Sequence, residues 1–270
     1  MNLIRNSETP LIAAHRGVSG GNIPCNCEAA FKAALYQGAE IVELDVSVSR
    51  DKELFVFHPM KESAHLNSPK LIRLLKADKV KKRRFVNQDN DDTEQRVMTL
   101  DEAFELLKDK CIINIDKFWT APKLITDCVR RHNMQQQVII KTSDSERDFK
   151  MVEEIAPELP YMAMVKRKDD VSEKLLKRKL NFVGIEAIFE TDDDEIISDA
   201  HIEWLHKNSL AIWGNAIVYD YRAIIGARHT DDVAITGNPD YGWGWYKDKH
   251  FDIIQTDWAG AVRHYFESER

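Results

Sequence analysis

The sequence predicts a single (β/α)8 TIM barrel spanning residues 1–270. Short apolar runs alternate with longer amphipathic stretches from end to end, giving eight strand-plus-helix units. Strands that alternate with helices of about ten residues favour parallel pairing with right-handed crossovers. An open doubly wound sheet is the competing fold, but it usually carries a glycine-rich phosphate motif after its first strand, and this chain has none there. Eight units in about 250 residues therefore favour the closed barrel.

The N-terminal half supplies the first elements by the spacing of its apolar residues. Uninterrupted apolar runs predict strands, and apolar residues three and four apart predict helices. Gly38 closes the first helix, and Thr99 opens the second. In chain order, the expected elements are a strand at 11–14, a helix at 26–38, a strand at 40–48, an extension or partner strand at 54–57, a helix at 98–110, a strand at 111–115 and a helix at 122–132.

The C-terminal half repeats this alternation without a break. The helix around 219–227 has the weakest apolar pattern of the series. In chain order, the expected elements are strands at 138–140, 161–165, 182–185, 210–213 and 251–255, each followed by a helix, at 146–155, 171–180, 201–208, 219–227 and 258–267.

Residues 60–96 do not fit the alternation, and we interpret them as a small insertion after the second strand. They contain a basic run at 76–84 and an acidic, polar run at 89–92. Runs of like charge are typical of solvated surface. Alternatively, the segment forms a cap that attracts an anionic substrate.

Composition and charge narrow the possible partners. The 270 residues are 43% hydrophobic and 31% charged, with a net charge of −7. These values are typical of a globular protein and disfavour a non-specific nucleic-acid binder, which needs surplus Lys and Arg. No apolar run approaches the roughly 20 residues that span a bilayer, and the N-terminus lacks a signal-peptide pattern. We expect a cytoplasmic protein without stable membrane insertion or nucleic acid, with reduced cysteines and an undetermined oligomeric state.

Polar side chains gather where the predicted strands end, which is where the chemistry of barrel enzymes lies. They include two histidines, carboxylates and cations from different strands. The candidates, in chain order, are His15, Arg16, Glu43, Asp45, His58, Asp116, Lys141, Glu186 and Trp213.

Three of these candidates could hold a metal ion. Glu43 and Asp45 are two apart on a strand, so their side chains leave the same face. Two buried carboxylates are costly unless a cation neutralises them. Together with Asp116 they offer oxygen ligands suited to Mg²⁺ or Ca²⁺. The alternative interpretation is a salt-bridged pair at a sheet edge.

His15 and His58 form a candidate acid–base pair, because imidazole titrates near neutral pH. Either histidine alone could instead be structural. Arg16 beside His15 could bind a phosphoryl oxygen through its planar guanidinium. Cations, a metal site, an acid and a base together indicate phosphoester chemistry.

The motif Ala14-His15-Arg16-Gly17, with Pro24-x-Asn26, the Glu43-x-Asp45 strand and His58, resembles the glycerophosphodiester phosphodiesterases. The resemblance implies a (β/α)8 barrel and hydrolysis of glycerophosphodiesters to glycerol 3-phosphate and an alcohol. It also implies one divalent cation and a small-molecule phosphodiester substrate. By the same resemblance, His15 and His58 are general acid and base in undetermined order. The implied ligand sets are Glu43, Asp45 and Asp116 for the metal and Arg16 for the phosphate.

The chain departs from the family pattern at several positions. Cys25 stands where the family usually has Glu, and Pro59 follows His58 in place of Asp. The third ligand is Asp116 rather than Glu, with Phe118 at the usual lysine position. Strand alternation is expected to turn Lys117 away, which leaves Lys141 as the substitute cation. Cys25 is either a nucleophile or a small half-buried neighbour.

The remaining candidates have open roles. Trp213 ends a strand and is expected to form a pocket wall, while Glu186 pairs with Lys141 or touches the substrate glycerol. The loop at 237–245, with three Gly and three aromatic residues, is either a lid or an anchored connection. Two rival functions remain: a phospholipase D- or C-like enzyme on the same fold, and a non-catalytic phosphoester-binding protein.

Overall fold

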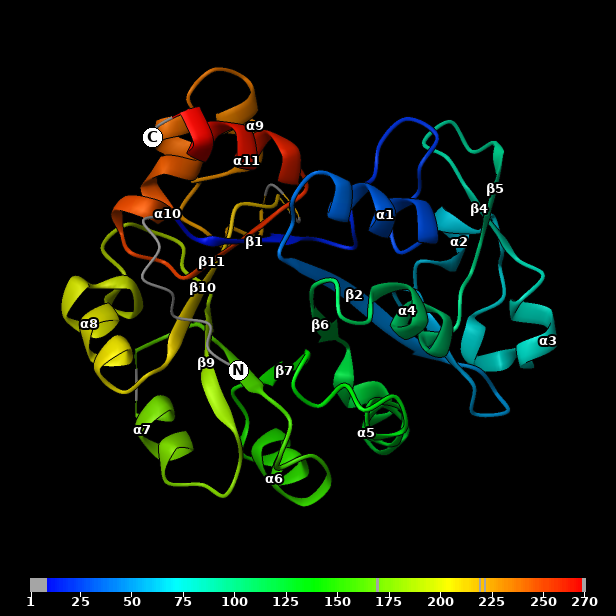
Figure 1. The fold of residues 1–270 in the computed structure, drawn as a ribbon, viewed down its shortest axis with the longest axis horizontal. Helices are drawn as coiled ribbons and strands as arrows, with labels where there is room; N and C mark the ends of the chain where they lie inside the picture. The colour runs from blue at the N-terminus through cyan, green and yellow to red at the C-terminus, as the bar shows by residue number, and fades with distance from the viewer. Residues whose placement is uncertain (1–8, 169, 219, 221, 269–270) are drawn as a thin grey trace.

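The computed structural model describes residues 9–168, 170–218, 220 and 222–268. Within them, eight parallel strands close into a barrel, because the last strand pairs with the first and the first with the second (Figure 1). The predicted (β/α)8 barrel is confirmed. Its strands are β1 (Leu11–Ala14), β2 (Ile41–Val48), β6 (Ile112–Asp116), β7 (Val138–Ser143), β8 (Tyr161–Val165), β9 (Phe182–Ala187), β10 (Ala211–Asn215) and β11 (Ile253–Thr256).

The barrel strands are apolar almost throughout because both of their faces are buried. One set of side chains, including Ile41, Ile139 and Trp213, forms a cluster of its own. The alternate set, including Val42 and Ile140, packs with helix residues in the main core. The first cluster therefore fills the barrel interior. The polar residues at the strand ends lie on the same inward face of the strands.

Helices surround the strands, and their ends follow ordinary capping chemistry. Thr99 caps one helix with a full capping box, in which Glu102 bonds back to the Thr99 backbone. Cys27 accepts from Ala30 N with its sulfur at the start of another. The helices are α1 (Glu28–Tyr36), α4 (Leu100–Leu107), α5 (Pro122–Arg131), α6 (Glu146–Ile155), α7 (Val171–Leu176), α8 (Asp199–Lys207), α9 (Asp231–Ile235), α10 (Trp245–Asp248) and α11 (Ala259–Ser268), with short turns η2 (Phe118–Thr120) and η3 (Glu195–Ile197).

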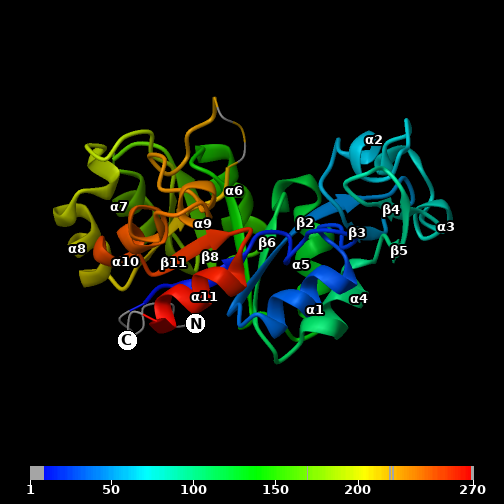
Figure 2. The same cartoon turned by 90° about the horizontal axis from the view of Figure 1, so that it is seen from above.

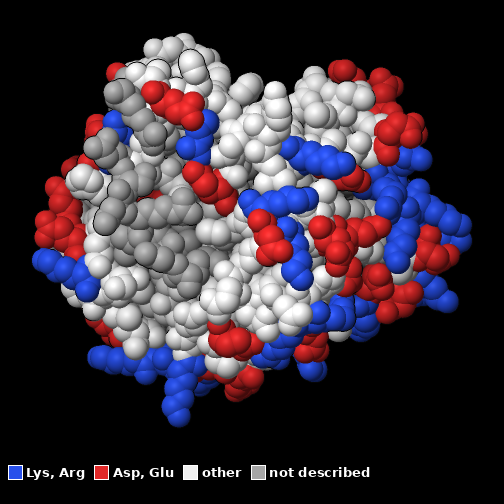
Figure 3. All heavy atoms as spheres, viewed as in Figure 1, with Lys and Arg blue, Asp and Glu red and all other residues white. Residues whose placement is uncertain are grey.

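The insertion lies to one side of the barrel (Figure 2). It follows β3 (Leu54–Val56), which pairs antiparallel with β2, and it buries a separate cluster that includes Phe55, Phe57 and Phe85. The basic residues of the insertion are mostly exposed and lie among acidic ones, as the face of the molecule drawn in Figure 3 shows. Its elements are α2 (Glu62–His65), η1 (Ile72–Leu74), α3 (Ala77–Val80), β4 (Arg84–Val86) and β5 (Asp92–Arg96).

Two expected connections between β10 and β11 differ in the structure. The prediction of a helix at 219–227 is wrong for residues 222–227, which form turns and bends. Tyr219 and Tyr221 lie outside the residues that the structure describes. Ala227 and Arg228 have positive φ, which ends helical continuation, and Thr230 then caps α9.

The expected loop at 237–245 is also wrong in part, because η4 (Asp240–Gly244) forms a turn of π-helix that leads into α10. Trp243 in this turn is buried, and its indole nitrogen donates to Asp231 at 2.7 Å. These contacts favour the anchored connection over the lid.

No helix within the described residues is both long and apolar enough to cross a membrane.

Candidate active site

The polar candidates lie where the inner face of the barrel reaches the carboxyl ends of the strands. Ile41, Glu43 and Asp45 alternate along β2 on the inward face. The same parity continues on β6, whose Asp116 pairs in register with Asp45. His15 follows β1, which lies against β2. The barrel therefore brings together side chains that are far apart in the sequence, such as His15 and Asp116.

Glu43, Asp45 and Asp116 form one carboxylate cluster. One oxygen from each lies within 4.8 Å of the others. Burial and the neighbouring Asp45 raise the pKa of Glu43 above its usual value. Burial acts in the same direction on Asp116, but Lys117 and Lys141 outweigh it and hold the pKa of that carboxyl below its usual range.

Asp45 lies at the centre of this cluster and is fully buried. Its Oδ2 accepts from Asn26 Nδ2 at 2.8 Å and lies 2.9 Å from Arg16 Nε. No hydrogen-bond donor among the described residues reaches its Oδ1. A buried carboxylate oxygen without a donor is costly, and a cation would relieve that cost. The residues therefore fit a divalent ion with oxygen ligands.

His15 is held by Asp257 at the end of β11. Its Nδ1 donates to Asp257 Oδ1 at 2.8 Å. Burial lowers the pKa of His15, but the hydrogen bond to Asp257 and the charge of Glu43 outweigh it, so the pKa is raised overall. With Nδ1 fixed as a donor, the neutral ring carries its lone pair on Nε2, where it can accept a proton.

His58 approaches the same cluster from β3. Its Nδ1 donates to the Pro59 carbonyl at 2.8 Å, and its Nε2 lies 3.9 Å from Asp45 Oδ1. The backbone oxygen of Pro59 therefore orients the ring. Burial lowers the pKa of His58 below its usual value despite the charge of Asp45.

Lys117 reaches the cluster, so the expectation that strand alternation turns it away is wrong. β6 ends at Asp116, and Lys117 has a φ of 60°, which breaks the alternation. Its Nζ lies 2.5 Å from Asp116 Oδ2 and 4.0 Å from Asp45 Oδ1. Lys117 therefore supplies a cation that the sequence pattern assigned to Lys141.

Lys141 is also present in the mouth, but it is paired with Glu186. Its Nζ lies 2.6 Å from Glu186 Oε2, and Asn215 donates to Glu186 Oε1 at 2.8 Å. The Trp213 ring lies beneath the ammonium, 4.3 Å from it, and is fully buried. Trp213 therefore supports Lys141 from inside the barrel and exposes no surface to a ligand.

Sequence reasoning assigned no role to three residues that hold the site together, namely Asn26, Asp231 and Asp257. Asn26 has a φ of 56° and hydrogen-bonds to Asp45 through both its amide nitrogen and its carbonyl oxygen. Asp231 accepts from Thr256 Oγ1 at 2.6 Å and from Asp257 N at 2.8 Å, which fixes the segment that orients His15. The sequence shows a Thr-Asp pair after the last strand, but only the closed barrel places it beside His15.

Cys25 is a half-buried thiol beside this centre. Burial raises its pKa to about 11, although the charge of Arg16 acts in the opposite direction. A thiol with such a pKa stays protonated at neutral pH and is a poor nucleophile. The structure therefore favours the interpretation of Cys25 as a small neighbour.

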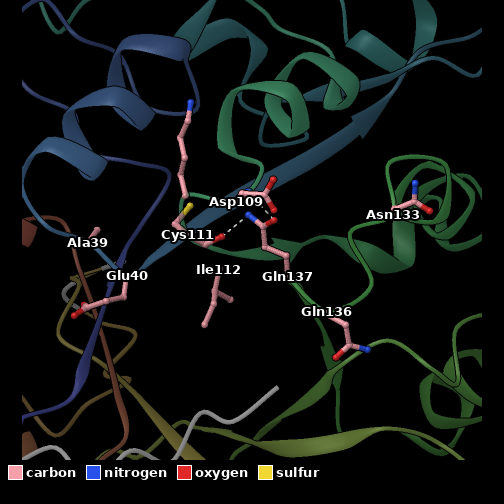
Figure 4. Close-up of a pocket in the computed structure, with 9 residues that line it drawn as sticks. Ala39, Glu40, Asp109, Cys111, Ile112, Asn133, Gln136 and Gln137 are labelled. Carbon is pink, nitrogen blue, oxygen red and sulfur yellow. Dashed lines mark hydrogen bonds between the residues drawn. The ribbon is translucent and has the colours of Figure 1, made fainter.

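A cavity lies at the opposite end of the barrel, where the strands begin, and none of these groups lines it. It has a volume of about 510 Å³ and is lined by residues before β2, β6 and β7, including Glu40, Cys111 and Gln137 (Figure 4). Gln137 Nε2 donates to the Cys111 carbonyl at 2.5 Å, which ties its wall together. Size alone does not identify the active site, because the paired histidines and carboxylates are at the other end.

Sequence families cover most of the chain. A model described as the glycerophosphoryl diester phosphodiesterase family matches residues 15–212, and a domain of unknown function matches residues 161–266. A glycerophosphodiester phosphodiesterase from Caldanaerobacter subterraneus subsp. tengcongensis is 30% identical over 164 residues, covering 55% of this chain and 64% of that protein. One from Bacillus altitudinis is 42% identical over 62 residues, covering 23% and 25%. The chain thus spans less than two thirds of the length of these curated relatives.

Solved structures share the fold. A glycerophosphoryl diester phosphodiesterase from Parabacteroides distasonis has a TM-score of 0.79 at 17% identity, covering 99% of this chain and 90% of its own. A phosphodiesterase from Oleispira antarctica, solved in complex with the product sn-glycerol-3-phosphate, has a TM-score of 0.70 at 16% identity, covering 96% and 97%. At these identities the likeness shows the barrel alone.

Proposed function

Because the chain belongs to the glycerophosphoryl diester phosphodiesterase family, we propose that it hydrolyses glycerophosphodiesters to glycerol 3-phosphate and an alcohol. The observation that carries the proposal is the donor-free oxygen of Asp45 in a three-carboxylate cluster, flanked by two histidines and two cations. In that arrangement the carboxylates could bind a metal ion, the two cations could bind an anionic substrate, and the two histidines could transfer protons.

Glu43, Asp45 and Asp116 would hold one divalent cation, Mg²⁺ or Ca²⁺. When bound, such an ion supplies Lewis-acid stabilisation of the charge that develops on the phosphoryl oxygens. Arg16 and Lys117 lie against the same carboxylates and would orient the remaining anionic oxygens through charge-assisted hydrogen bonds.

The two histidines would carry the protons. One ring accepts a proton from the attacking water or from the neighbouring substrate hydroxyl, and the other donates a proton to the leaving alkoxide. Asp257 and the Pro59 carbonyl each fix one Nδ1, which leaves both Nε2 atoms for these transfers. Attack by the neighbouring hydroxyl would pass through a cyclic phosphate.

Lys141 and Glu186 would contact the substrate's glycerol portion from the opposite wall of the mouth. They form a buried ion pair, with exposed side-chain fractions of 3% and 8%, so only their inward edges face a ligand. Trp213 holds the ammonium in place beneath.

The test is product release from glycerophosphocholine, glycerophosphoethanolamine and glycerophosphoglycerol, with glycerol 3-phosphate and the free alcohol measured separately. We expect stoichiometric release of both products. Cleavage of liposomal phospholipid without action on soluble diesters would support the phospholipase alternative. Ligand binding without turnover of any diester would support a phosphoester-binding protein.

A further inference from the structure

We propose that the alcohol portion of the diester binds in a cavity between the β1–α1 loop and the insertion, and that this cavity selects neutral, hydroxyl-bearing alcohols over cationic ones. The inference rests on the proposed function and adds the class of alcohol released. The cavity has a volume of about 260 Å³. This is below the roughly 300–1,000 Å³ typical of pockets for drug-sized ligands, so it suits a small head group rather than a lipid chain.

The cavity adjoins the catalytic centre through Cys25 and His65. Cys25 lines the cavity, and the next residue, Asn26, donates from Nδ2 to Asp45 Oδ2 at 2.8 Å. His65 also lines the cavity, and its ring is in edge contact with Phe57, the residue before His58. The cavity therefore opens beside the side chains that would hold the phosphate and transfer a proton.

This position separates the two halves of a bound diester. We place the phosphate against Arg16 and the carboxylate cluster. Lys141 and Glu186 then form the wall of the mouth on one side of it. On the side of Arg16, the centre adjoins Cys25, which lines the cavity. If the glycerol lies against the Lys141 wall, as proposed above, the alcohol points toward the insertion.

The lining has the chemistry of a neutral polar site. Its described residues include no Asp, Glu, Lys or Arg, and they present Ser19, Gln88 and Asn90 together with the apolar Ile23 and Val86. Hydroxyl groups can exchange hydrogen bonds with amide and hydroxyl side chains.

A quaternary ammonium group would lack both an offsetting carboxylate and an open aromatic cage. None of the described residues that line the cavity carries a carboxylate, and Arg16 places a cation on the side of Cys25. The His65 ring is already in edge contact with Phe57, with centroids 6.4 Å apart. A cationic alcohol therefore loses its hydration without gaining a partner.

The wall formed by the insertion is held in shape by Asn87. Its Oδ1 accepts from the backbone nitrogens of Asp89 and Asp91, and its Nδ2 donates to Asn22 at 3.1 Å. These bonds close the turn between β4 and β5 and connect it to the β1–α1 loop. The neighbouring Gln88 is exposed and can be changed without disturbing them.

The experiment compares kcat/KM for glycerophosphoglycerol and glycerophosphocholine in the intact protein and in Gln88→Glu, which adds a carboxylate of nearly the same shape. We expect at least about tenfold preference for glycerophosphoglycerol, the order of one or two hydrogen bonds. Gln88→Glu should lower that preference by about two- to fivefold, as one partly exposed ion pair would. Ser19→Asp on the other wall should act in the same direction.

Gln136→Glu is the matched control, because Gln136 is exposed and lines the cavity at the far end of the barrel (Figure 4). It should leave the preference unchanged. Hydrolysis of both diesters without preference, or equal ratios in Gln88→Glu, Ser19→Asp and the control, would overturn the alcohol site and leave the proposed function standing. Absence of turnover on every diester would overturn both.

Discussion

At the scale of single residues, the site depends on two histidines whose rings are fixed from behind. His15 is held by Asp257, and His58 by the carbonyl of Pro59. Both rings are consequently held in one orientation, and the Nε2 of His58 lies 3.9 Å from Asp45 Oδ1. This is the arrangement that general acid–base catalysis requires.

Replacing either of the two histidines proposed as acid and base should reduce turnover strongly. His15→Ala and His58→Ala should each lower kcat by roughly 10²–10⁴, the usual contribution of a general acid or base. His264→Ala on the exposed face of α11 is the control and should be near wild type. Steady-state kinetics on a soluble glycerophosphodiester makes the comparison, and losses below about tenfold in both variants would contradict the assignment.

Asp257 should matter through His15 rather than through substrate contact. Asp257→Asn replaces a charged hydrogen-bond acceptor by a neutral one, and hydrogen bonds to charged groups contribute about 1.5–3 kcal/mol, so kcat/KM should fall roughly 10- to 150-fold. His15→Ala combined with Asp257→Asn should lose little more than His15→Ala alone. Full additivity of the two losses would show that Asp257 acts independently.

The candidate residues were largely predictable from the sequence, and the exceptions have physical causes. His15, Glu43 and His58 lie on strands or directly after them, so local alternation places them correctly. Lys117 was missed because a single residue with positive φ reverses the direction of its side chain. Asp257 was missed because its partner His15 is 242 residues away and meets it only when β11 pairs with β1.

At the scale of elements, close packing between neighbouring strands leaves no room for a side chain at Gly184. A Cβ there would lie 2.1 Å from the Ala211 carbonyl oxygen on β10. The register of β9 against β8 also shifts in this region. The glycine therefore allows β9 and β10 to pair closely below Glu186.

Gly184→Ala should destabilise the protein by at least about 1–3 kcal/mol, the usual cost of overpacking. Gly237→Ala is the control, because it also has a positive φ of 130° but no atom within 4 Å of the added Cβ. Urea unfolding followed by circular dichroism should give a clearly lower midpoint for Gly184→Ala than for the control. Equal midpoints would show that strand spacing is not the constraint.

The contact between α8 and the start of β11 should make stability depend on pH. The hydrogen bond from His206 to Asp252 raises the pKa of His206 above its usual 6.5. The stabilisation is complete below the unfolded-state pKa and is lost as pH rises through the higher folded-state pKa. His206→Gln should therefore cost more stability at pH 5.5 than at pH 8.5, measured by urea unfolding at each pH. A cost that is the same at both pH values would contradict the ionic role.

Element boundaries were predictable where apolar periodicity is strong and were not where the connections are irregular. The strand at 138–140 continues to Ser143, because Lys141 and Thr142 are polar but buried. The connections between β10 and β11 were misassigned because they are stabilised by contacts between residues distant in the chain, such as Trp243 with Asp231. Single-sequence periodicity carries no information on such partners.

At the scale of the whole molecule, closure of the barrel creates the site. β1 pairs with both β2 and β11, so residues from the two ends of the chain meet at one mouth. The carboxylates of β2 and β6 lie beside the histidines that follow β1 and β3, and the insertion forms the adjoining wall. The fold brings together three carboxylates, two of which are paired with Arg16 and Lys117.

The most direct test of this account is reconstitution of metal-stripped protein. After treatment with EDTA and removal of the chelator, the wild type should have lost turnover of glycerophosphoglycerol and should regain it with Mg²⁺ or Ca²⁺. Calorimetry should detect binding of the same ion by the wild type and strongly weakened binding by Asp45→Asn. Full turnover in the stripped protein, or undiminished metal affinity in Asp45→Asn, would contradict the central claim that the carboxylate cluster holds a metal needed for hydrolysis.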